Sequence, residues 1–171
     1  VVSIGNYSVR GKYINNNNYI SKNFKENISS YILDKEDLTM ILNDKTSKGN
    51  IIGKVLYIDE KDGYVFNQRT MRLKCKKTVN PLFLYYSINS DKAHTNILNK
   101  AKPGTQIYIN TDDVLSVQVD IPMDIKEQKA IAEILSDMDS EIEALNKKLV
   151  KYKKIKQGMM EELLTGRIRL V

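Results

Sequence analysis

The C-terminal part of the chain carries an apolar repeat that constrains the fold more than any other feature. Two series of residues each recur every seven positions, and the series alternate by three and four along the chain. They are Leu135, Ile142, Leu149, Lys156 and Leu163, and Ile131, Met138, Leu145, Tyr152 and Met159. Proline is absent after Pro122, and the next glycine after the repeat begins is Gly158. The pattern predicts one helix from about Glu127 to Leu164, with the two series forming the a and d seam of a coiled coil.

A helix of this length needs more cover than a small domain can give it. At 1.5 Å per residue it would extend roughly 55 Å. The alternative is an amphipathic helix lying on its own domain, and the length of the seam argues against that. We therefore expect a second helix to cover the seam.

The same helix changes its charge halfway along. The first half carries acids with no base among them, and the second half carries lysines with no acid among them. The acids are Glu133, Asp137, Asp139, Glu141 and Glu143, and the lysines are Lys147, Lys148, Lys151, Lys153, Lys154 and Lys156. A parallel pair in register would set like charges side by side, whereas an antiparallel pair centred near Leu145 would set acids beside lysines.

These flanking charges act on orientation more than on stability. Each pair adds only a few tenths of a kcal/mol, about the value for exposed pairs. Like-charge contacts nevertheless penalise the wrong orientation, so the order predicts an antiparallel partner. Lys156 at a seam position either restricts the register or extends its ammonium past the edge of the seam, and the sequence leaves both open.

Composition limits the class of protein. The 171 residues suffice for one domain of ordinary size with an appendage, and the net charge of +6 favours a polyanionic partner. The single cysteine, Cys75, excludes an internal disulfide, and no apolar run reaches the roughly 18 residues of a membrane span. With no signal peptide visible, we expect a cytoplasmic protein without membrane contact. The single histidine, His94, is expected to be a solvated residue on a helix surface.

Residues 1 to about 125 predict a small domain of mixed α and β structure. Short β-branched runs indicate strands over 37–42, 51–58, 64–66, 71–74 and 118–121, with a tight turn over 61–63. Asn80 and Pro81 suit the N-cap and first position of one helix, and Ser90 suits the cap of a second helix through Leu98. The predicted fold class is α+β, with a mixed or antiparallel-sheet domain over 1–125 followed by a helical region over 126–171.

No pattern in the chain indicates catalysis. The segment 80–83 (NPLF) is similar to the loop with which amino-methyltransferases hold a flipped base, but its second proline is missing and no glycine-rich cofactor loop follows a strand. The acids of 59–62 lie beside the turn glycine Gly63 and are typical of a solvated hairpin end. We expect a protein without enzymatic activity, bound cofactor or metal.

Several motifs together resemble a known family. They are Pro122, then Glu127-Gln128 and Ile131, and then a long helix that ends Leu163-Leu164-Thr165-Gly166. In these residues the chain resembles the specificity (S) subunits of type I restriction–modification systems. The segments GNIIGKVLYI, VFNQRTMRL and AKPGTQIYIN are similar to the central strands of that family and to its small-Gly-Thr-Gln segment. The resemblance covers nearly the whole chain and is weakest over the first 40 residues.

The resemblance implies a function in DNA recognition. A complete S subunit has two target-recognition domains and two conserved helices that pair antiparallel, and the two domains read the halves of a split site in double-stranded DNA. This chain has one domain and one helix, which leaves two alternatives: the C-terminal half of an S subunit, or a short half-subunit that dimerises. The family also implies docking of methyltransferase subunits and of a motor–nuclease subunit, and these partners hold S-adenosylmethionine and ATP.

Three polar stretches have the residue types that contact base edges or phosphates. The stretch 43–50 contains Lys45, Thr46, Ser47 and Lys48; the stretch 67–69 is Asn67, Gln68 and Arg69; and the stretch 102–106 contains Lys102, Thr105 and Gln106. Each stretch taken alone is also typical of an ordinary surface loop. Two rival functions stay open: a coiled-coil interaction module without nucleic-acid binding, and a DNA binder without sequence preference.

Overall fold

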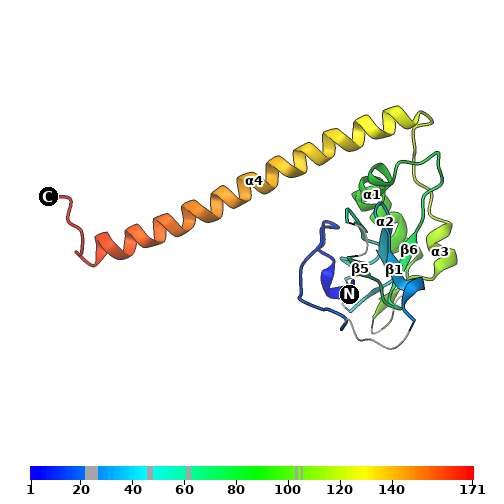
Figure 1. Cartoon of the computed structure of the whole chain (residues 1–171), viewed down its shortest axis with the longest axis horizontal. Helices are drawn as coiled ribbons and strands as arrows, with labels where there is room; N and C mark the ends of the chain where they lie inside the picture. Colours follow the sequence, from blue (N-terminus) through cyan, green and yellow to red (C-terminus); the bar gives the residue numbers. More distant parts are fainter. Residues whose placement is uncertain (22–26, 46–47, 61–62, 103, 105) are drawn as a thin grey trace. The chain divides into compact units, whose positions relative to one another are not determined.

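The computed structural model of the chain describes residues 1–21, 27–45, 48–60, 63–102, 104 and 106–171. It contains two compact units, Val1–Ala132 and Glu133–Val171 (Figure 1). The strands are β1 (Ile32–Leu33), β2 (Leu38–Ile41), β3 (Asn43–Asp44), β4 (Val55–Tyr57), β5 (Tyr64–Val65), β6 (Thr70–Leu73) and β7 (Ile107–Tyr108). The helices are α1 (Pro81–Asn89), α2 (Asp91–Lys100), α3 (Thr111–Leu115) and α4 (Ile125–Leu164), with single 3-10 turns η1 (Ile4–Asn6) and η2 (Ser29–Tyr31).

Strand β2 is the centre of the first unit. It pairs antiparallel with β4 on one side and with β6 on the other, so that Thr39 lies opposite Leu56 and Arg72. All four residues of β2 are buried, because both faces of the strand are covered. Leu38 and Met40 point to one apolar cluster, and Ile41 points to another, as the alternation of side chains along a strand requires.

Helices α1, α2 and α3 supply the cover on one face of β2. Ile88 of α1, Ile97 of α2 and Val114 of α3 pack in the cluster that contains Leu38 and Met40. The N-terminal segment covers the other face, where Val2 and Tyr7 join Ile41. The Tyr7 hydroxyl lies 3.0 Å from Thr39 Oγ1 and satisfies the polar group that this buried strand carries. Two further strand pairs, β1 with β5 and β3 with β7, lie outside the three-stranded sheet.

Both predicted helix caps are confirmed. The Asn80 side chain accepts a hydrogen bond from Phe83 N (2.8 Å) with Pro81 at the first position of α1. Ser90 Oγ accepts from Ala93 N (3.3 Å) at the start of α2. The long helix is confirmed as α4, which begins two residues earlier than predicted, because Asp124 Oδ1 accepts from Lys126 N (2.8 Å) and caps it. Gly166, at a φ of +73°, follows its last turn.

The sequence-based assignment was wrong for several short elements. Residues 118–121 join no strand of the described structure, because their alternation reflects Val117 and Val119 packing on the core while Gln118 and Asp120 face solvent. The strand predicted over 51–58 is reduced to β4, because Gly53 adopts a φ of +70° in a turn before it. Helix α3 and the strand character of Asn43–Asp44 were missed. The predicted tight turn falls partly on residues 61–62, which lie outside the described residues.

Candidate nucleic-acid interface

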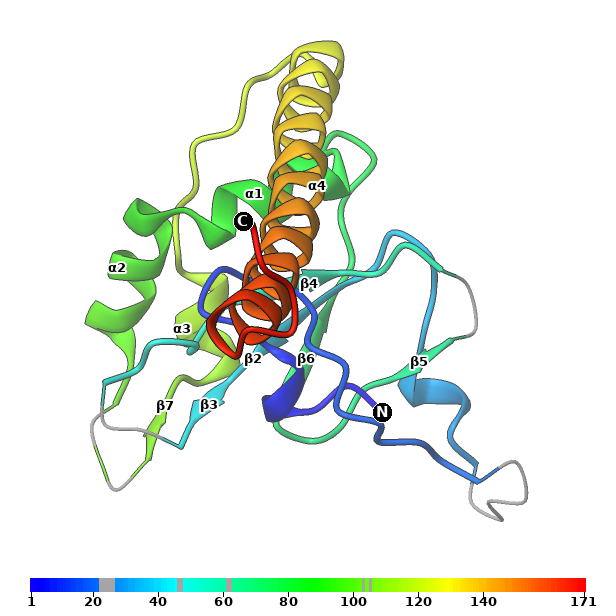
Figure 2. The same ribbon diagram turned by 90° about the vertical axis from the view of Figure 1, so that its left-hand side faces the viewer.

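The three polar stretches singled out in the sequence are joined through one short segment of backbone, residues 41–44. Ile41 pairs with Thr70, directly after the 67–69 turn. Leu42 N donates to Arg69 O (3.0 Å), and Leu42 O accepts from Ile109 N (3.0 Å). Asp44 then pairs with Ile107, directly after the 102–106 stretch. Strand residues advance by only about 3.3 Å each. The beginning of the first stretch and the ends of the other two therefore lie close together, at the same edge of the unit (Figure 2).

The 44–51 loop, which contains all but the first residue of the 43–50 stretch, has a closed base and exposed lysines. Asp44 is buried, and its Oδ2 accepts from Ile51 N (3.0 Å), which joins the two ends of the loop. Gly49 is buried at a φ of +65°, and a Cβ there would lie 2.6 Å from Leu98 Cδ2 of α2. Lys45 and Lys48 are exposed, as a phosphate-contacting role requires. Thr46 and Ser47 lie outside the described residues.

The 67–69 turn is held by its own asparagine. Asn67 Oδ1 accepts from Arg69 N (3.0 Å), and Asn67 O accepts from both the amide (3.0 Å) and the hydroxyl (2.9 Å) of Thr70. This local pattern makes Asn67 a turn former, so one of the two atoms needed for a bidentate base contact is already engaged. Gln68 and Arg69 are exposed beside it. The turn therefore presents two side chains that can read base edges.

The third stretch follows α2 and leads into β7. Lys102 forms an antiparallel bridge with Tyr108, with Lys102 N donating to Tyr108 O at 2.8 Å. The side chains of Lys102 and Gln106 are exposed, whereas Thr105 lies outside the described residues. Since β7 runs antiparallel to β3, Gln106 immediately precedes the position opposite Asp44, and Lys45 immediately follows it. The first and third stretches are thus neighbours in space.

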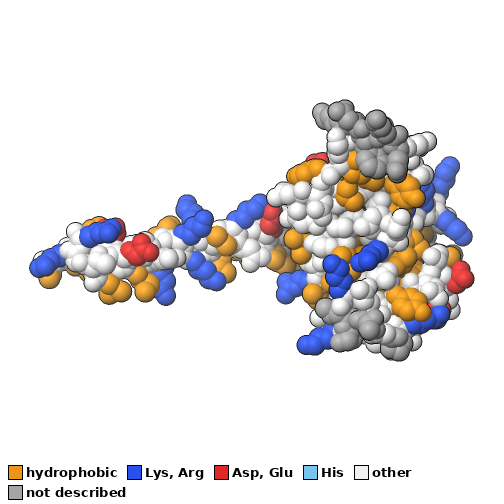
Figure 3. Space-filling model, turned by 90° about the horizontal axis from the view of Figure 1, so that it is seen from below, with side chains coloured by type: hydrophobic (Ala, Val, Ile, Leu, Met, Phe, Trp, Pro, Cys, Tyr) orange, Lys and Arg blue, Asp and Glu red, His pale blue; other side chains and the backbone are white. Residues whose placement is uncertain are grey.

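The described charges of these stretches are mostly positive. Lys45, Lys48, Arg69 and Lys102 are exposed, and the acid among them, Asp44, is buried with its carboxylate turned to the backbone of Ile51. Figure 3 shows Lys and Arg side chains spread over one face of the first unit, with fewer acidic side chains, which lie toward its margins. Positive charge of this kind attracts phosphate groups but does not by itself distinguish one base sequence from another.

His94 contacts the base of the 44–51 loop, which the sequence did not indicate. It was expected to be solvated, but it is half-buried, and its Nε2 lies 3.1 Å from the carbonyl oxygen of Gly49 in the 44–51 loop. Burial lowers the pKa of His94, and the nearby ammonium of Lys54 lowers it further. Lys54 is itself buried, and its Nζ donates to Asn89 O (3.1 Å) at the end of α1. No local pattern in the sequence indicated this contact, because Gly49 and His94 are 45 positions apart and only the folded chain brings them together.

The predicted seam of α4 lies along residues that are largely exposed in the second unit. Met138, Ile142, Leu145, Leu149, Tyr152, Lys156 and Met159 are exposed, and Ile131, Leu135 and Leu163 are half-buried. Ile142 has 45% and Leu149 50% of its surface exposed, high fractions for large aliphatic side chains. The seam residues from Leu149 to Leu163 line an open apolar groove. Exposed apolar surfaces of this kind are typical of sites that bind a partner.

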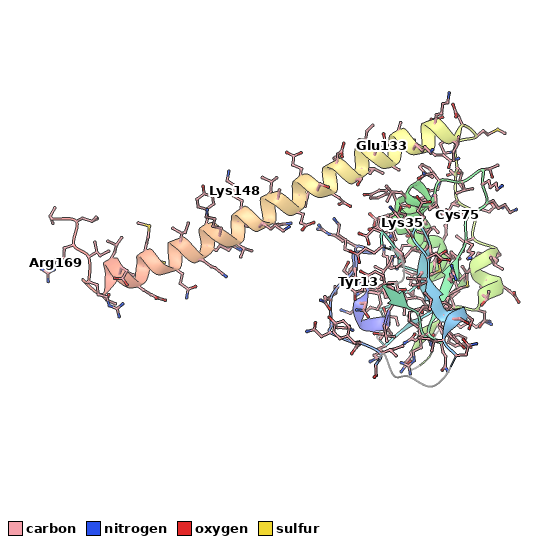
Figure 4. The ribbon with its side chains drawn as sticks, in the orientation of Figure 1. Tyr13, Lys35, Cys75, Glu133, Lys148 and Arg169 are labelled. Carbon is pink, nitrogen blue, oxygen red and sulfur yellow. The ribbon has the colours of Figure 1, made fainter. Side chains whose placement is uncertain are left out.

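Glu143 and Lys147 show how the charge order is placed on α4. Their side chains form an i,i+4 ion pair with Nζ 2.7 Å from Oε1, at the boundary between the acidic and basic halves. Figure 4 shows Glu133 and Lys148 projecting from α4 on either side of this boundary. The described part of the chain contains no group of three or more His, Cys, Asp or Glu side chains placed to bind a metal ion. Within the same residues, no helix is both long and apolar enough to cross a membrane.

Comparison with known proteins identifies the family. The model of the type I restriction modification DNA specificity domain matches residues 4–154. This chain belongs to that family, as the motifs of its helix and strands indicate. The type I restriction enzyme MjaVIII specificity subunit of Methanocaldococcus jannaschii is 32% identical over 155 residues, which are 89% of this chain and 36% of that protein.

A second relative from the same organism gives a similar match. The putative type I restriction enzyme MjaX specificity subunit is 30% identical over 150 residues, which are 86% of this chain and 34% of that protein. The chain therefore spans about a third of the length of these relatives.

Proposed function

We propose that this chain is a DNA-recognition component of a type I restriction–modification complex, reading one half of a bipartite site. The observation that carries the proposal is the hydrogen-bonded segment 41–44, which joins three exposed polar stretches at one edge. The reading side chains are Gln68, Arg69 and Gln106, with Lys45, Lys48 and Lys102 contacting phosphates. Asn67 holds the turn from which Gln68 and Arg69 project.

The α4 helix supplies the second part of the proposal. Its exposed seam pairs antiparallel with an equivalent helix, from a second copy or from a second half of a longer S subunit, and the pair separates the two reading domains. Membership of the family supports docking of methyltransferase subunits and of a motor–nuclease subunit onto this assembly. S-adenosylmethionine and ATP belong to those partners, and this chain itself is not an enzyme.

Selection from a pool of randomised duplexes tests the reading function. The full chain should enrich one short sequence, and its affinity for that duplex should fall steeply with salt, because phosphate contacts release counterions. Equal binding of all duplexes would favour a DNA binder without sequence preference. Absence of binding at low salt would favour a coiled-coil interaction module, for which the exposed α4 seam alone is sufficient.

Purification of the chain from its native host tests the assembly. We expect a methyltransferase subunit to co-purify with it. Mass spectrometry of the complex then gives the number of copies of this chain. Two copies indicate a dimer of half-subunits, and one copy with a second recognition domain indicates half of a larger S subunit.

A further inference from the structure

The start of α4 is attached to the first unit by one polar side chain, Gln128. Gln128 and Ala132 are the two buried residues of α4, each with 1% of its surface exposed. They are spaced by four and therefore lie on one face of the helix. Both belong to the first compact unit, as do all the groups that Gln128 contacts.

The Gln128 side chain uses both of its N–H donors and its amide oxygen in hydrogen bonds. Oε1 accepts from Asn80 N (2.7 Å), and Nε2 donates to the carbonyl oxygens of Thr78 (3.1 Å) and Pro122 (2.8 Å). A reversed amide would set its oxygen against two carbonyl oxygens and its NH₂ against an N–H, so one orientation is possible. The contact therefore requires an acceptor and two donors in a fixed order, which glutamine provides.

The three partners of Gln128 come from different parts of the chain. Thr78 and Asn80 precede α1, and Asn80 also caps α1 by accepting from Phe83 N (2.8 Å). Pro122 belongs to the segment that enters α4, and Asp124 caps α4 two residues later. One side chain thus joins the residues before α1, the entry segment and the first turns of α4.

The helix α1 is in turn fixed to the sheet next to the proposed reading edge, which is the edge formed by the stretches 43–50, 67–69 and 102–106. At its end, Asn89 Oδ1 accepts from Val55 N (3.0 Å), and its Nδ2 donates to Val55 O (2.9 Å) in β4. Strand β4 pairs with β2, which runs directly into residues 41–44. A continuous set of hydrogen bonds therefore leads from Gln128 through α1 and β4 to the reading edge.

We propose that Gln128 is a positioning residue that holds α4 to the reading domain and so determines which spacing between half-sites the protein accepts. This rests on the proposed function, because a spacing exists only if two domains read one DNA molecule. Loss of the contact leaves the reading residues intact but lets α4 pivot at its first turns. The domain would then still bind a half-site while the paired molecule accepts a wider range of spacings.

Variants at residue 128 can distinguish the loss of these hydrogen bonds from unfolding of the first unit. Gln128→Glu keeps the size and the acceptor but places carboxylate oxygen against the carbonyls of Thr78 and Pro122, and Gln128→Met keeps the length without any hydrogen bond. Glu127→Gln, at the exposed neighbouring position, is the matched control. Thermal unfolding of each full-length variant shows whether the first unit remains folded, and Gln128→Met is the milder change if the buried charge of Gln128→Glu prevents folding.

Distances between two spin labels show, without DNA, whether the Gln128 contact holds α4 in one position. Cysteines replacing Lys35 on the first unit and Lys148 on α4, both exposed, carry the labels in a Cys75→Ser background diluted with unlabelled chain (Figure 4). The proposal predicts a narrow distance distribution for wild type and Glu127→Gln, and a broadened one for folded Gln128 variants. A broad wild-type distribution, or a Gln128 variant as narrow as wild type, would overturn it.

The effect on spacing is measured by binding to duplexes that carry two selected half-sites at varied spacing. Wild type should prefer one spacing, and Gln128→Met should lose that preference while its affinity for a single half-site is unchanged. A broadened label distribution with an unchanged spacing preference contradicts the functional part of the inference. If wild type binds no DNA, the proposed function fails, and the label distances still decide whether Gln128 holds the helix.

Discussion

Leu42 and Arg69 are joined by a backbone hydrogen bond, from Leu42 N to Arg69 O at 3.0 Å, and this contact positions the 67–69 turn beside β3. The carbonyl oxygen of Leu42 accepts from Ile109 N on its other side, also at 3.0 Å. The backbone of Leu42 therefore connects the 67–69 turn with Ile109, the residue that follows β7. The stretches converge because of backbone pairing, which their own side chains do not specify.

Gly49→Ala should destabilise the first unit by more than about 1 kcal/mol, because alanine is strained at positive φ and its Cβ would press on Leu98. Gly63→Ala is the control in the same unit, since among the described residues the nearest atom to a Cβ there is Glu60 Oε2 at 3.7 Å. Urea unfolding of the full chain measures both free energies of unfolding. Equal stability of the two variants would mean that the base of the 44–51 loop is not closed as described.

Stability should depend on pH through His94. Its pKa in the folded chain is lowered, mainly by burial and next by Lys54, so the unfolded chain binds this proton at higher pH than the folded chain does. The free energy of unfolding should therefore decrease as the pH falls from about 7 through the unfolded value near 6.5. His94→Gln should remove this part of the dependence.

The chain has one histidine, so a single imidazole proton signal reports its titration by NMR. A signal that titrates at or above the usual value for histidine would contradict the lowered pKa. A His94→Gln variant with the same pH dependence between 5.5 and 7 would assign that dependence to other titrating groups.

Self-association should require the α4 seam. Ile142→Asp with Leu149→Asp places two charges in the middle of the proposed pair and should weaken association on the order of 100-fold or more, because an unpaired buried charge costs several kcal/mol. Ser140→Asp with Ala144→Asp adds the same charge at exposed positions outside the seam. Sedimentation equilibrium measures both. Wild-type chain that stays monomeric at high concentration, or a cross-linked pair that is parallel, would refute the antiparallel account.

The charge halves should contribute modestly to that association. Glu141→Lys with Glu143→Lys removes the acids that face lysines in an antiparallel pair, and the Glu143 change also breaks the ion pair with Lys147. Association should weaken more at low salt than at high salt, since exposed charges are screened. Equal weakening at all salt concentrations would point to a change in helix stability instead.

The purified chain should neither methylate nor cleave DNA. Its sequence offers no cofactor loop, and family membership associates it with recognition. The measurement is transfer of labelled methyl groups from S-adenosylmethionine to duplex DNA containing the selected sequence. If the purified chain transfers methyl groups when it is free of any second subunit, the prediction that it is not an enzyme is wrong.

Local signals in the sequence identified the helices well and the sheet partly. The heptad pattern predicted α4, and the Asn80-Pro81 and Ser90 caps predicted α1 and α2, because helix signals depend on near neighbours. The α+β class and the family were confirmed as well. The prediction of a strand over 118–121 was wrong. Alternating side chains show only that one side of the segment is buried, whereas a strand also needs a paired neighbour, and the described structure shows none for this segment.

The site was less accessible to sequence reasoning than the fold. Its exposed cations and amides could be picked out by residue type, and whether they contact DNA remains a prediction. Asp44, Gly49 and His94, which close the base of the 44–51 loop, are separated by up to fifty positions and carry no local signal. Gln128 was noted as part of a motif, but its role depends on Thr78 and Asn80, which only the folded chain brings to it.

The most direct test of the reading edge compares base preference in three variants of the full chain, measured position by position on the selected duplex. Arg69→Ala and Gln68→Ala should each relax the preference at one base pair, by about 1–3 kcal/mol for a bidentate contact. Lys48→Ala should instead weaken binding to every sequence alike and flatten the salt dependence, because it removes a phosphate contact. Unchanged base preference in both the Arg69 and Gln68 variants would contradict the account and place the reading surface elsewhere on the domain.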